Sequence, residues 1–252
     1  MMARERRKSL PDPVLLLVLV GAAVVASVVA GVAGFGAGII LLPVLAWVLG
    51  VKAAVPVLTI TMLLGNISRM WWSRADVDRA VAVRFIVGAV PASALGAWVY
   101  AGSSSEGLSR VIGAFLLVGL PLRRLLITRN VRVRLVHFPF LGAALGALSS
   151  LVVTTGPVMT PFFLAYGLRR GAYIATDSIC AFAMHIARGA AFARLRVISW
   201  DGVAVGLLLG LTMFLGSWIG RRLLDRMSER LFLVVIEGLV VVMGLHFLLV
   251  PR

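Results

Sequence analysis

Several charged side chains lie inside long apolar stretches of this sequence, where a charge is costly to place and therefore indicates function. Arg69 and Arg188 carry guanidinium groups that could bind an anion. Arg188 lies deep in its stretch, whereas Arg69 is about one helical turn from the end and could reach the membrane interface. Glu237 is a candidate proton carrier, with an ion pair to another helix as the alternative.

Asp177 and Arg188 share one face of a predicted helix with Ala181 and Met184, because these positions are spaced by 4, 3 and 4 residues. At a rise of 1.5 Å per residue, Asp177 and Arg188 lie about 16 Å apart and cannot pair directly. His185 lies on a neighbouring flank and is, with Asp177, a candidate for proton coupling. The structural alternatives are a helix cap or an interhelical hydrogen bond for Asp177, and a purely structural role for His185.

Two short segments contain residues that interrupt helices. "GFGAGIILLP" at 34–43 has glycines at every second position before a proline, and "VVTTGPVMTP" at 152–161 aligns with it. Helix amino termini exposed at such interruptions attract anions, and threonine hydroxyls add donors. Close packing of small residues is the structural alternative. The candidate substrate-binding residues here are Gly36, Gly38, Thr154, Thr155 and Gly156.

The composition places these residues in a membrane protein. The 252 residues are 61% hydrophobic and 14% charged, with a mean hydropathy of +1.03. A soluble protein could not bury so much apolar surface, and helices are the expected spanning element. The net charge of +15 comes from basic residues clustered in loops, as membrane orientation requires, so nucleic-acid binding is not expected. The single cysteine, Cys180, excludes an intrachain disulfide.

Eight apolar stretches are about 20 residues long, near the length that crosses a bilayer. Two shorter stretches follow the interruptions, and no soluble domain is present, so residues 1–252 form one transmembrane domain. The long stretches are 14–33, 53–72, 81–101, 107–127, 135–153, 172–193, 201–220 and 231–250, and the short ones are 38–50 and 157–167.

The chain contains an internal duplication, with a first repeat at 14–127 and a second at 135–250. "NISR" at 66–69 matches "HIAR" at 185–188. Asn66 is thereby the equivalent of His185, and it is a candidate substrate-binding residue that can make similar polar contacts without titrating. "LGAW" at 95–98 matches "LGSW" at 215–218. Ordered matches at offsets of 118 to 120 indicate two related halves. Paired interruptions in two repeats are typical of a transporter's substrate site.

Charge in equivalent loops favours an inverted arrangement of the repeats. The loop at 102–107 has no basic residue, whereas its equivalent at 221–230 has four arginines. Opposite bias implies opposite sides of the membrane and hence five segments in each repeat. This arrangement puts the amino terminus outside, at the cost of placing the basic residues at 4–8 outside too. Eight crossings with an internal amino terminus is the alternative.

The ordered set of these features resembles the sulfite exporter TauE/SafE family of permeases. The resemblance covers about 14–250 and includes the "GxxGxGxGxxxxP" pattern ending at Pro43, and "GSWIGRRLLDRMSERLFLVVIEGLVVVMGLHFLL" at 216–249. It implies a secondary transporter in a bacterial inner membrane that exports a small anion, such as sulfite, a sulfonate or a related organic acid. The second half has fewer glycines than the pattern, which leaves the substrate open.

Two other functions compete with transport. An intramembrane enzyme would need a catalytic set, but the three histidines are scattered and no metal-binding "HExxH" occurs. No ATP-binding loop is present, so we expect neither a cofactor nor direct ATP drive. A scaffold or assembly factor without transport activity would need neither paired interruptions nor buried charge. The expected partners are a small anion, the lipid bilayer and a coupled proton, and the oligomeric state stays open.

Overall fold

The computed structural model describes residues 12–33, 37–73, 76–128, 132–153, 155–168, 170–223 and 245. Every regular element in these ranges is helical, which confirms the all-α prediction. The elements are α1 (Pro13–Ala33), α2 (Ala37–Leu49), α3 (Val51–Ser73), α4 (Arg79–Gly102), α5 (Ser105–Thr128), the 3-10 turn η2 (Leu135–His137), α6 (Phe138–Val152), α7 (Gly156–Tyr166), α8 (Arg170–Arg194) and α9 (Trp200–Leu223).

The helix bounds follow the apolar stretches of the sequence closely. The stretch at 14–33 is α1, and the short stretches at 38–50 and 157–167 correspond to α2 and α7. The close match is expected in a membrane. The bilayer core offers no water to the backbone, so each N–H and C=O group must be hydrogen-bonded within its own helix. The stretch at 231–250, including Glu237, lies outside the described residues.

The chain leaves the helical conformation between α6 and α7, inside one of the two segments singled out in the sequence. Val153 ends α6 with φ 61° and ψ −39°, a region that a β-branched residue rarely enters. At the other segment α1 ends at Ala33 and α2 begins at Ala37, and residues 34–36 lie outside the described residues. Both short helices therefore begin close behind a longer one.

Glycine ends both short helices. Gly50 follows α2 with φ +82°, and Gly167 follows α7 with φ +110°. This left-handed conformation is open to glycine without steric cost, so it closes the last helical turn. The amide of Gly167 donates to the carbonyls of Leu164 and Phe163. Gly50 leads directly into α3, and α8 begins three residues after Gly167.

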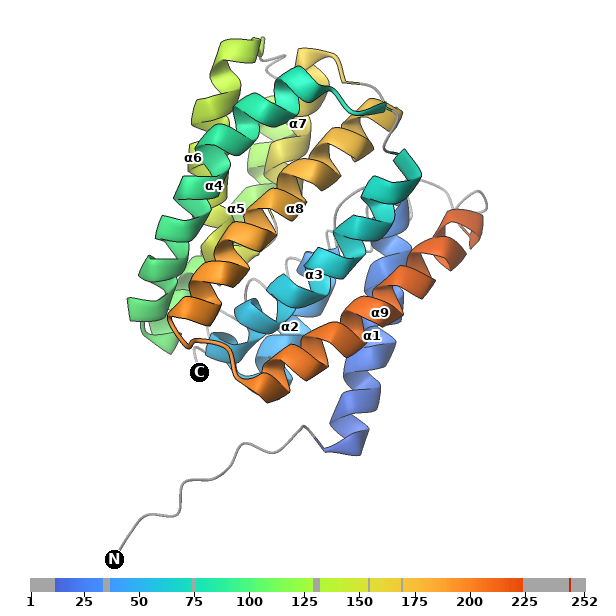
Figure 1. The fold of residues 1–252 in the computed structure, drawn as a ribbon, viewed down its shortest axis with the longest axis vertical. Coiled ribbons are helices and arrows are strands. Elements are labelled where there is room, and N and C mark those ends of the chain that lie inside the picture. Colours follow the sequence, from blue (N-terminus) through green and yellow to red (C-terminus); the bar gives the residue numbers. More distant parts are fainter. Residues whose placement is uncertain are drawn as a thin grey trace, which may run out of the picture.

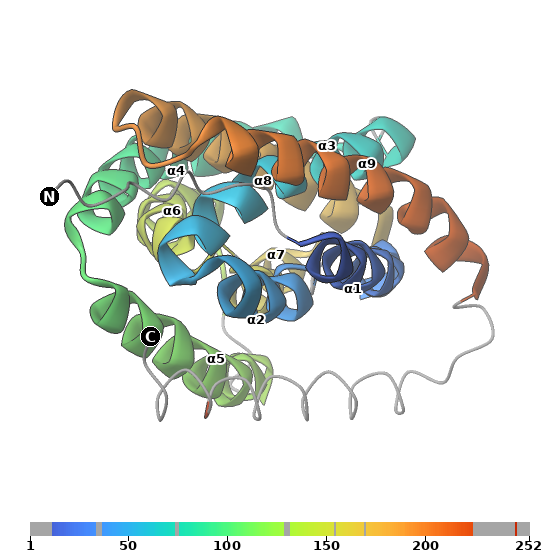
Figure 2. The ribbon, with the colours of Figure 1, turned by 90° about the horizontal axis from the view of Figure 1, so that it is seen from below.

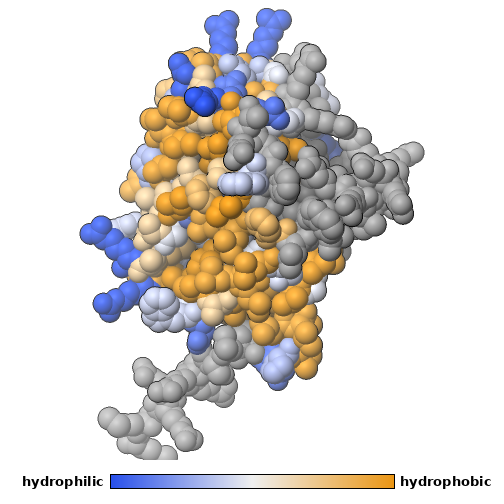
Figure 3. Space-filling view, turned by 45° about the vertical axis from the view of Figure 1, so that its right-hand side comes forward, coloured by the Kyte–Doolittle hydropathy of each residue, from blue (hydrophilic) through white to orange (hydrophobic). Residues whose placement is uncertain are grey.

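Five described helices are long and apolar enough to cross a membrane: α1, α3, α4, α5 and α6 with its preceding turn. Large apolar side chains such as Leu17, Leu95 and Phe140 are largely exposed on the outside of the molecule. Figure 3 shows such side chains forming a broad band across one face, with hydrophilic residues gathered toward its ends. An outer surface of this kind is expected where lipid replaces water.

The described helices form two bundles, and each bundle combines helices of one predicted repeat with the fourth helix of the other. In the first bundle α1, α2 and α3 pack with α9, and in the second bundle α6, α7 and α8 pack with α4. Figures 1 and 2 show the α4–α6 pair and the α1–α9 pair on opposite sides, with α3 and α8 between them. The fourth helix of each predicted repeat therefore packs on the first and third helices of the other repeat.

The direction of each helix can be followed in Figure 1. The α2–α3, α4–α5 and α8–α9 connections lie at the lower end, and the α3–α4 and α7–α8 connections lie at the upper end. α3 and α8 consequently run in opposite directions. α4 and α6 run in the same direction, because Gly142 lies against Phe85, and Ala147, later in α6, lies against Gly96, later in α4. α5 lies at the edge, where it packs on α7 and α6 (Figure 2).

Glycines let α4 and α6 approach closely. A Cβ atom on Gly88 of α4 would lie 1.9 Å from the carbonyl oxygen of Pro139 in α6. A Cβ atom on Gly142 of α6 would lie 2.1 Å from the carbonyl oxygen of Phe85 in α4. No side chain fits in either place, so the contact between these helices is backbone against backbone.

Candidate substrate cavity

A cavity of about 50 Å³ lies between the two bundles. Its walls come from α2 and α3 of the first bundle, and from α7, α8 and the residues before α7 in the second. Since roughly 10–15 Å³ of such space holds one water molecule, the cavity has room for a few waters or a compact group. It joins residues more than 140 positions apart in the sequence, from Ala37 to His185.

Seven of the residues predicted to act in transport line this cavity. They come from both repeats and from four helices or their first residues. They are Gly38, Asn66, Arg69, Thr155, Gly156, Asp177 and His185. Of the other candidates, Gly36, Thr154 and Glu237 lie outside the described residues, and Arg188 lies behind the cavity wall.

The amino termini of α2 and α7 meet at the cavity. Ala37 and Gly38 are the first residues of α2, and Thr155 and Gly156 are the N-cap and first residue of α7. The first N–H groups of a helix lack partners within the helix, and the helix dipole adds partial positive charge there. The hydroxyl of Thr155 makes no capping bond to α7. Pro157 has no N–H and the amide of Val158 donates to the carbonyl of Thr155, so α7 contributes mainly the partial positive charge of its dipole to this small volume.

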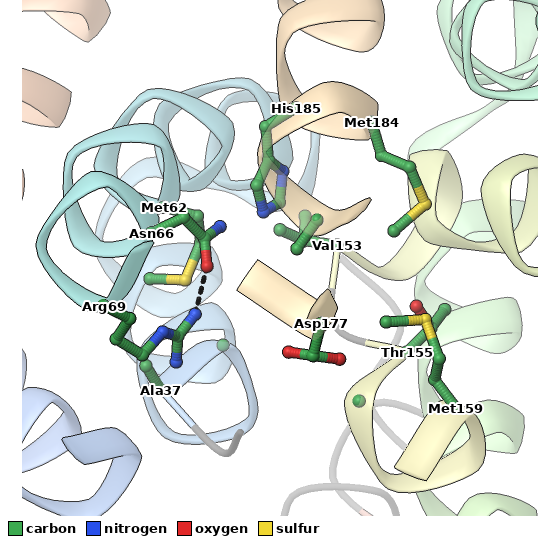
Figure 4. A pocket seen from close by; sticks show the side chains of 13 residues that line it. Ala37, Met62, Asn66, Arg69, Val153, Thr155, Met159, Asp177, Met184 and His185 are labelled. Atoms are coloured by element: carbon green, nitrogen blue, oxygen red, sulfur yellow. Dashed lines mark hydrogen bonds between the residues drawn. The ribbon is translucent and has the colours of Figure 1, made fainter. Parts of the chain in front are cut away.

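Arg69 and Asp177 give the cavity its charged groups. Arg69 on α3 donates to the side-chain oxygen of Asn66, one helical turn earlier, and interacts electrostatically with Asp177 on α8. Figure 4 shows Arg69 and Asn66 on one side, Thr155 and Met159 on the other, and Asp177 between them. Asp177 is the eighth residue of α8, so it does not cap that helix.

Two buried polar atoms beside the cavity have no hydrogen-bond partner within the described part of the chain. They are Nδ2 of Asn66, a donor, and Oδ1 of Asp177, an acceptor. The two residues are only 1% and 4% exposed. Buried polar groups are nearly always satisfied, so unpaired ones indicate a place where a ligand, water or proton binds. The cavity thus offers a donor for an anion and an acceptor for a proton.

Arg188 is fully buried and bonds only to protein groups among the described residues. Its Nε donates to Oγ1 of Thr59 at 2.9 Å, and its terminal nitrogens bond the carbonyl of Ser149 and Nδ1 of His185. It thereby ties α3, α6 and α8 together. Its charge lies near the carboxyl-terminal end of α6, where a helix dipole favours a cation.

Part of the apolar lining was not predicted from the sequence. Met62, Met159 and Val153 complete the wall, together with Ala181 and Met184, which the spacing had placed on the face of Asp177. Met62 could have been found by spacing, because it precedes Asn66 by four residues and Arg69 by seven on the same helical face. Val153 carries no such signal, since its place depends on the turn between α6 and α7. Flexible thioethers suit a site whose shape adapts to its ligand.

The fold and the cavity define this protein as an integral membrane protein whose helices enclose a small polar site. The chain belongs to the sulfite exporter TauE/SafE family, whose model matches residues 19–247. Membership implies a membrane transporter of sulfur-containing anions. Neither a curated protein nor a solved structure matches the chain.

Proposed function

We propose that this protein exports a small anion, such as sulfite, a sulfonate or a related organic acid, across a bacterial inner membrane. The observation that carries the proposal is the meeting of Arg69, Asn66 and two helix amino termini at one cavity between the bundles. Guanidinium, amide and helix-end donors together replace the water that an oxyanion loses on entry. The small volume favours a compact substrate.

We further propose alternating access, with the two bundles moving against each other around this cavity. Secondary transporters built from inverted repeats hold their substrate at such an interface, at the ends of interrupted helices. The opposite directions of α3 and α8, and the exchange of α4 and α9 between bundles, support two inverted repeats of five segments each. The amino terminus then lies outside.

Labelling of introduced cysteines tests this topology. Cys180 is buried, so the unmodified protein is expected to resist a membrane-impermeant thiol reagent in intact cells. Ser104→Cys, between α4 and α5, and Ser199→Cys, between α8 and α9, are expected to react from outside. Arg132→Cys, before α6, is expected to react only after permeabilisation. Labelling of Ser199→Cys only after permeabilisation would rule out the proposed arrangement, because eight crossings with an internal amino terminus place this residue inside.

Asp177 couples transport to a proton in this proposal. An ionised Asp177 competes with the substrate for Arg69, and a protonated Asp177 leaves the guanidinium to the anion. Among the described residues, Cys180 lies near it on α8, Tyr173 acts with it on Arg69, and His185 lines the same cavity. Binding of the anion and binding of a proton would thus favour each other, so the two would leave the cell together whenever the outward gradient of the anion exceeds the inward gradient of the proton.

Flux into proteoliposomes tests both the transport and its coupling. Purified protein is expected to accumulate sulfite or methanesulfonate in response to a pH gradient. Asp177→Asn removes the titrating group but keeps its shape, so it is expected to abolish gradient-driven accumulation while downhill exchange continues. Accumulation by Asp177→Asn equal to that of the unmodified protein would exclude Asp177 as the coupling group.

The competing function, a scaffold or assembly factor, is separated by the same measurement. A scaffold would show no flux of any small anion above that of empty liposomes, with the protein folded and correctly inserted. The unpaired atoms of Asn66 and Asp177 favour transport, because a structural role leaves no reason to bury them unsatisfied.

A further inference from the structure

Arg69 and Arg188 occupy equivalent positions in the two repeats. Each bonds a side chain on its own helix, and the two partner side chains differ in type. Arg69 donates to Oδ1 of Asn66, and Arg188 bonds Nδ1 of His185, in each case three residues earlier on the same helix. Each arginine engages an acceptor atom of its neighbour. This bond therefore decides which polar atom of Asn66 or His185 is left to face the cavity.

The bond to Arg188 fixes where His185 carries its proton. A guanidinium has only donors, so Nδ1 of His185 must accept. A neutral imidazole that accepts at Nδ1 carries its proton at Nε2. A second proton could bind at Nδ1 only after the bond to Arg188 had broken. His185 is therefore held in a single tautomer by a residue that lies outside the cavity.

The protonated nitrogen faces the substrate cavity. His185 is only 4% exposed and lines the cavity, and Figure 4 shows its imidazole pointing from α8 toward the space between Asn66 and Asp177. Nε2 lies at the end of the ring away from the backbone, so its N–H enters this space. Asn66 has the same arrangement, because its Oδ1 bonds Arg69 and its Nδ2 is the unpaired buried donor.

Each hydrogen bond around Arg188 has a defined donor and a defined acceptor. The hydroxyl of Thr59 donates to the carbonyl of Val55 at 2.8 Å and is thereby left to accept from Nε of Arg188. The carbonyl of Ser149, in the last turn of α6, accepts from a terminal nitrogen of the same guanidinium. With Arg188 anchored on α3 and α6, the nitrogen that reaches His185 has little freedom.

We propose that Arg188 is a positioning residue that orients His185 so that its Nε2–H donates to the bound anion, as Asn66 Nδ2 does from the opposite repeat. The site then holds the oxyanion between two N–H donors, one from each half of the chain, each set by its own arginine. His185 serves as a donor and leaves proton coupling to Asp177. This inference rests on the proposed transport function.

Nitrogen NMR of histidine-labelled protein in lipid nanodiscs tests the proposal. The chain has three histidines, so His185→Gln assigns the signal of interest, and His137 and His246 serve as internal references. The unmodified protein is expected to show a protonated Nε2 and an unprotonated Nδ1 for His185. Addition of sulfite is expected to shift the Nε2 signal. A proton on Nδ1, or averaging of the two tautomers, would overturn the proposal.

Two variants separate positioning from a merely structural role. Arg188→Lys keeps a donor and is expected to keep the tautomer, whereas Arg188→Met is expected to release it. Loss of one oriented hydrogen bond is expected to raise KM for sulfite about threefold to tenfold in Arg188→Met, with partial recovery in Arg188→Lys. Arg110→Met is the control, because Arg110 is exposed and pairs only with Glu106 one turn away.

The outcomes distinguish this inference from the transport proposal. If Arg188→Met does not fold, the spectrum of the unmodified protein still decides the tautomer. Sulfite flux with no change in the His185 signal would refute the donor role and leave transport intact. The expected tautomer without flux of any anion would refute transport, and with it the anion-donor role, and leave the Arg188–His185 bond as a structural feature.

Discussion

Arg69→Met is expected to weaken the binding of sulfite by roughly 10- to 100-fold. Among the described residues that line the cavity, Arg69 is the sole cation. A hydrogen bond to a charged group contributes about 1.5–3 kcal/mol, and about 1.4 kcal/mol corresponds to a factor of ten. The variant also removes the partner that orients Asn66. Titration calorimetry in detergent or nanodiscs measures the change.

The control for Arg69→Met is Arg110→Met, which removes a guanidinium from an exposed site on α5. It lowers the net charge equally but leaves the cavity unchanged, so sulfite affinity is expected to stay within twofold of the unmodified protein, roughly the effect of a distant surface charge. Equal loss in both variants would show that Arg69 acts through overall charge. Unchanged affinity in Arg69→Met would remove it from the site.

Gly142→Leu is expected to destabilise the folded protein by about 3 kcal/mol or more, at the upper end of what overpacking costs. The added Cβ would lie 2.1 Å from the carbonyl oxygen of Phe85, and the obstacle is backbone, which cannot rotate away. α4 and α6 would have to separate, and the second bundle would lose its main contact. Thermal unfolding of the purified protein, followed by circular dichroism, measures the loss.

Gly21→Ala is the matched control for the packing prediction. Gly21 lies in α1, and no atom is within 4 Å of the position where its Cβ would be. Alanine favours a helix interior over glycine by about 0.5–1 kcal/mol, so this variant is expected to be as stable as the unmodified protein or slightly more stable. Equal melting temperatures for the Gly142→Leu and Gly21→Ala proteins would contradict the close α4–α6 contact.

Much of the secondary structure could be predicted from the sequence, because lipid makes helix bounds readable. A run of apolar residues must satisfy its own backbone, so α4 begins and ends within two residues of the stretch at 81–101. The packing partners could not be predicted in this way. α4 and α9 look alike as apolar segments, and nothing in their composition says that each belongs beside the opposite repeat.

The roles of the two arginines show where sequence reasoning stops. Depth along an apolar stretch favoured Arg188 for substrate contact and left Arg69 as a residue that could reach the interface. In the structure Arg69 lines the cavity, and Arg188 is bonded to Thr59, Ser149 and His185 behind it. Position along a helix is readable from sequence, but the direction a side chain faces depends on which helices surround it.

The exchange of α4 and α9 has a mechanical consequence. Along its described length the chain passes from one bundle to the other only twice, between α3 and α4 and between α8 and α9. A rocking motion of one bundle against the other would therefore bend the backbone at these two links, near residues 76–78 and 195–199. Each moving bundle would contain helices from both repeats, so neither repeat alone forms a complete moving unit.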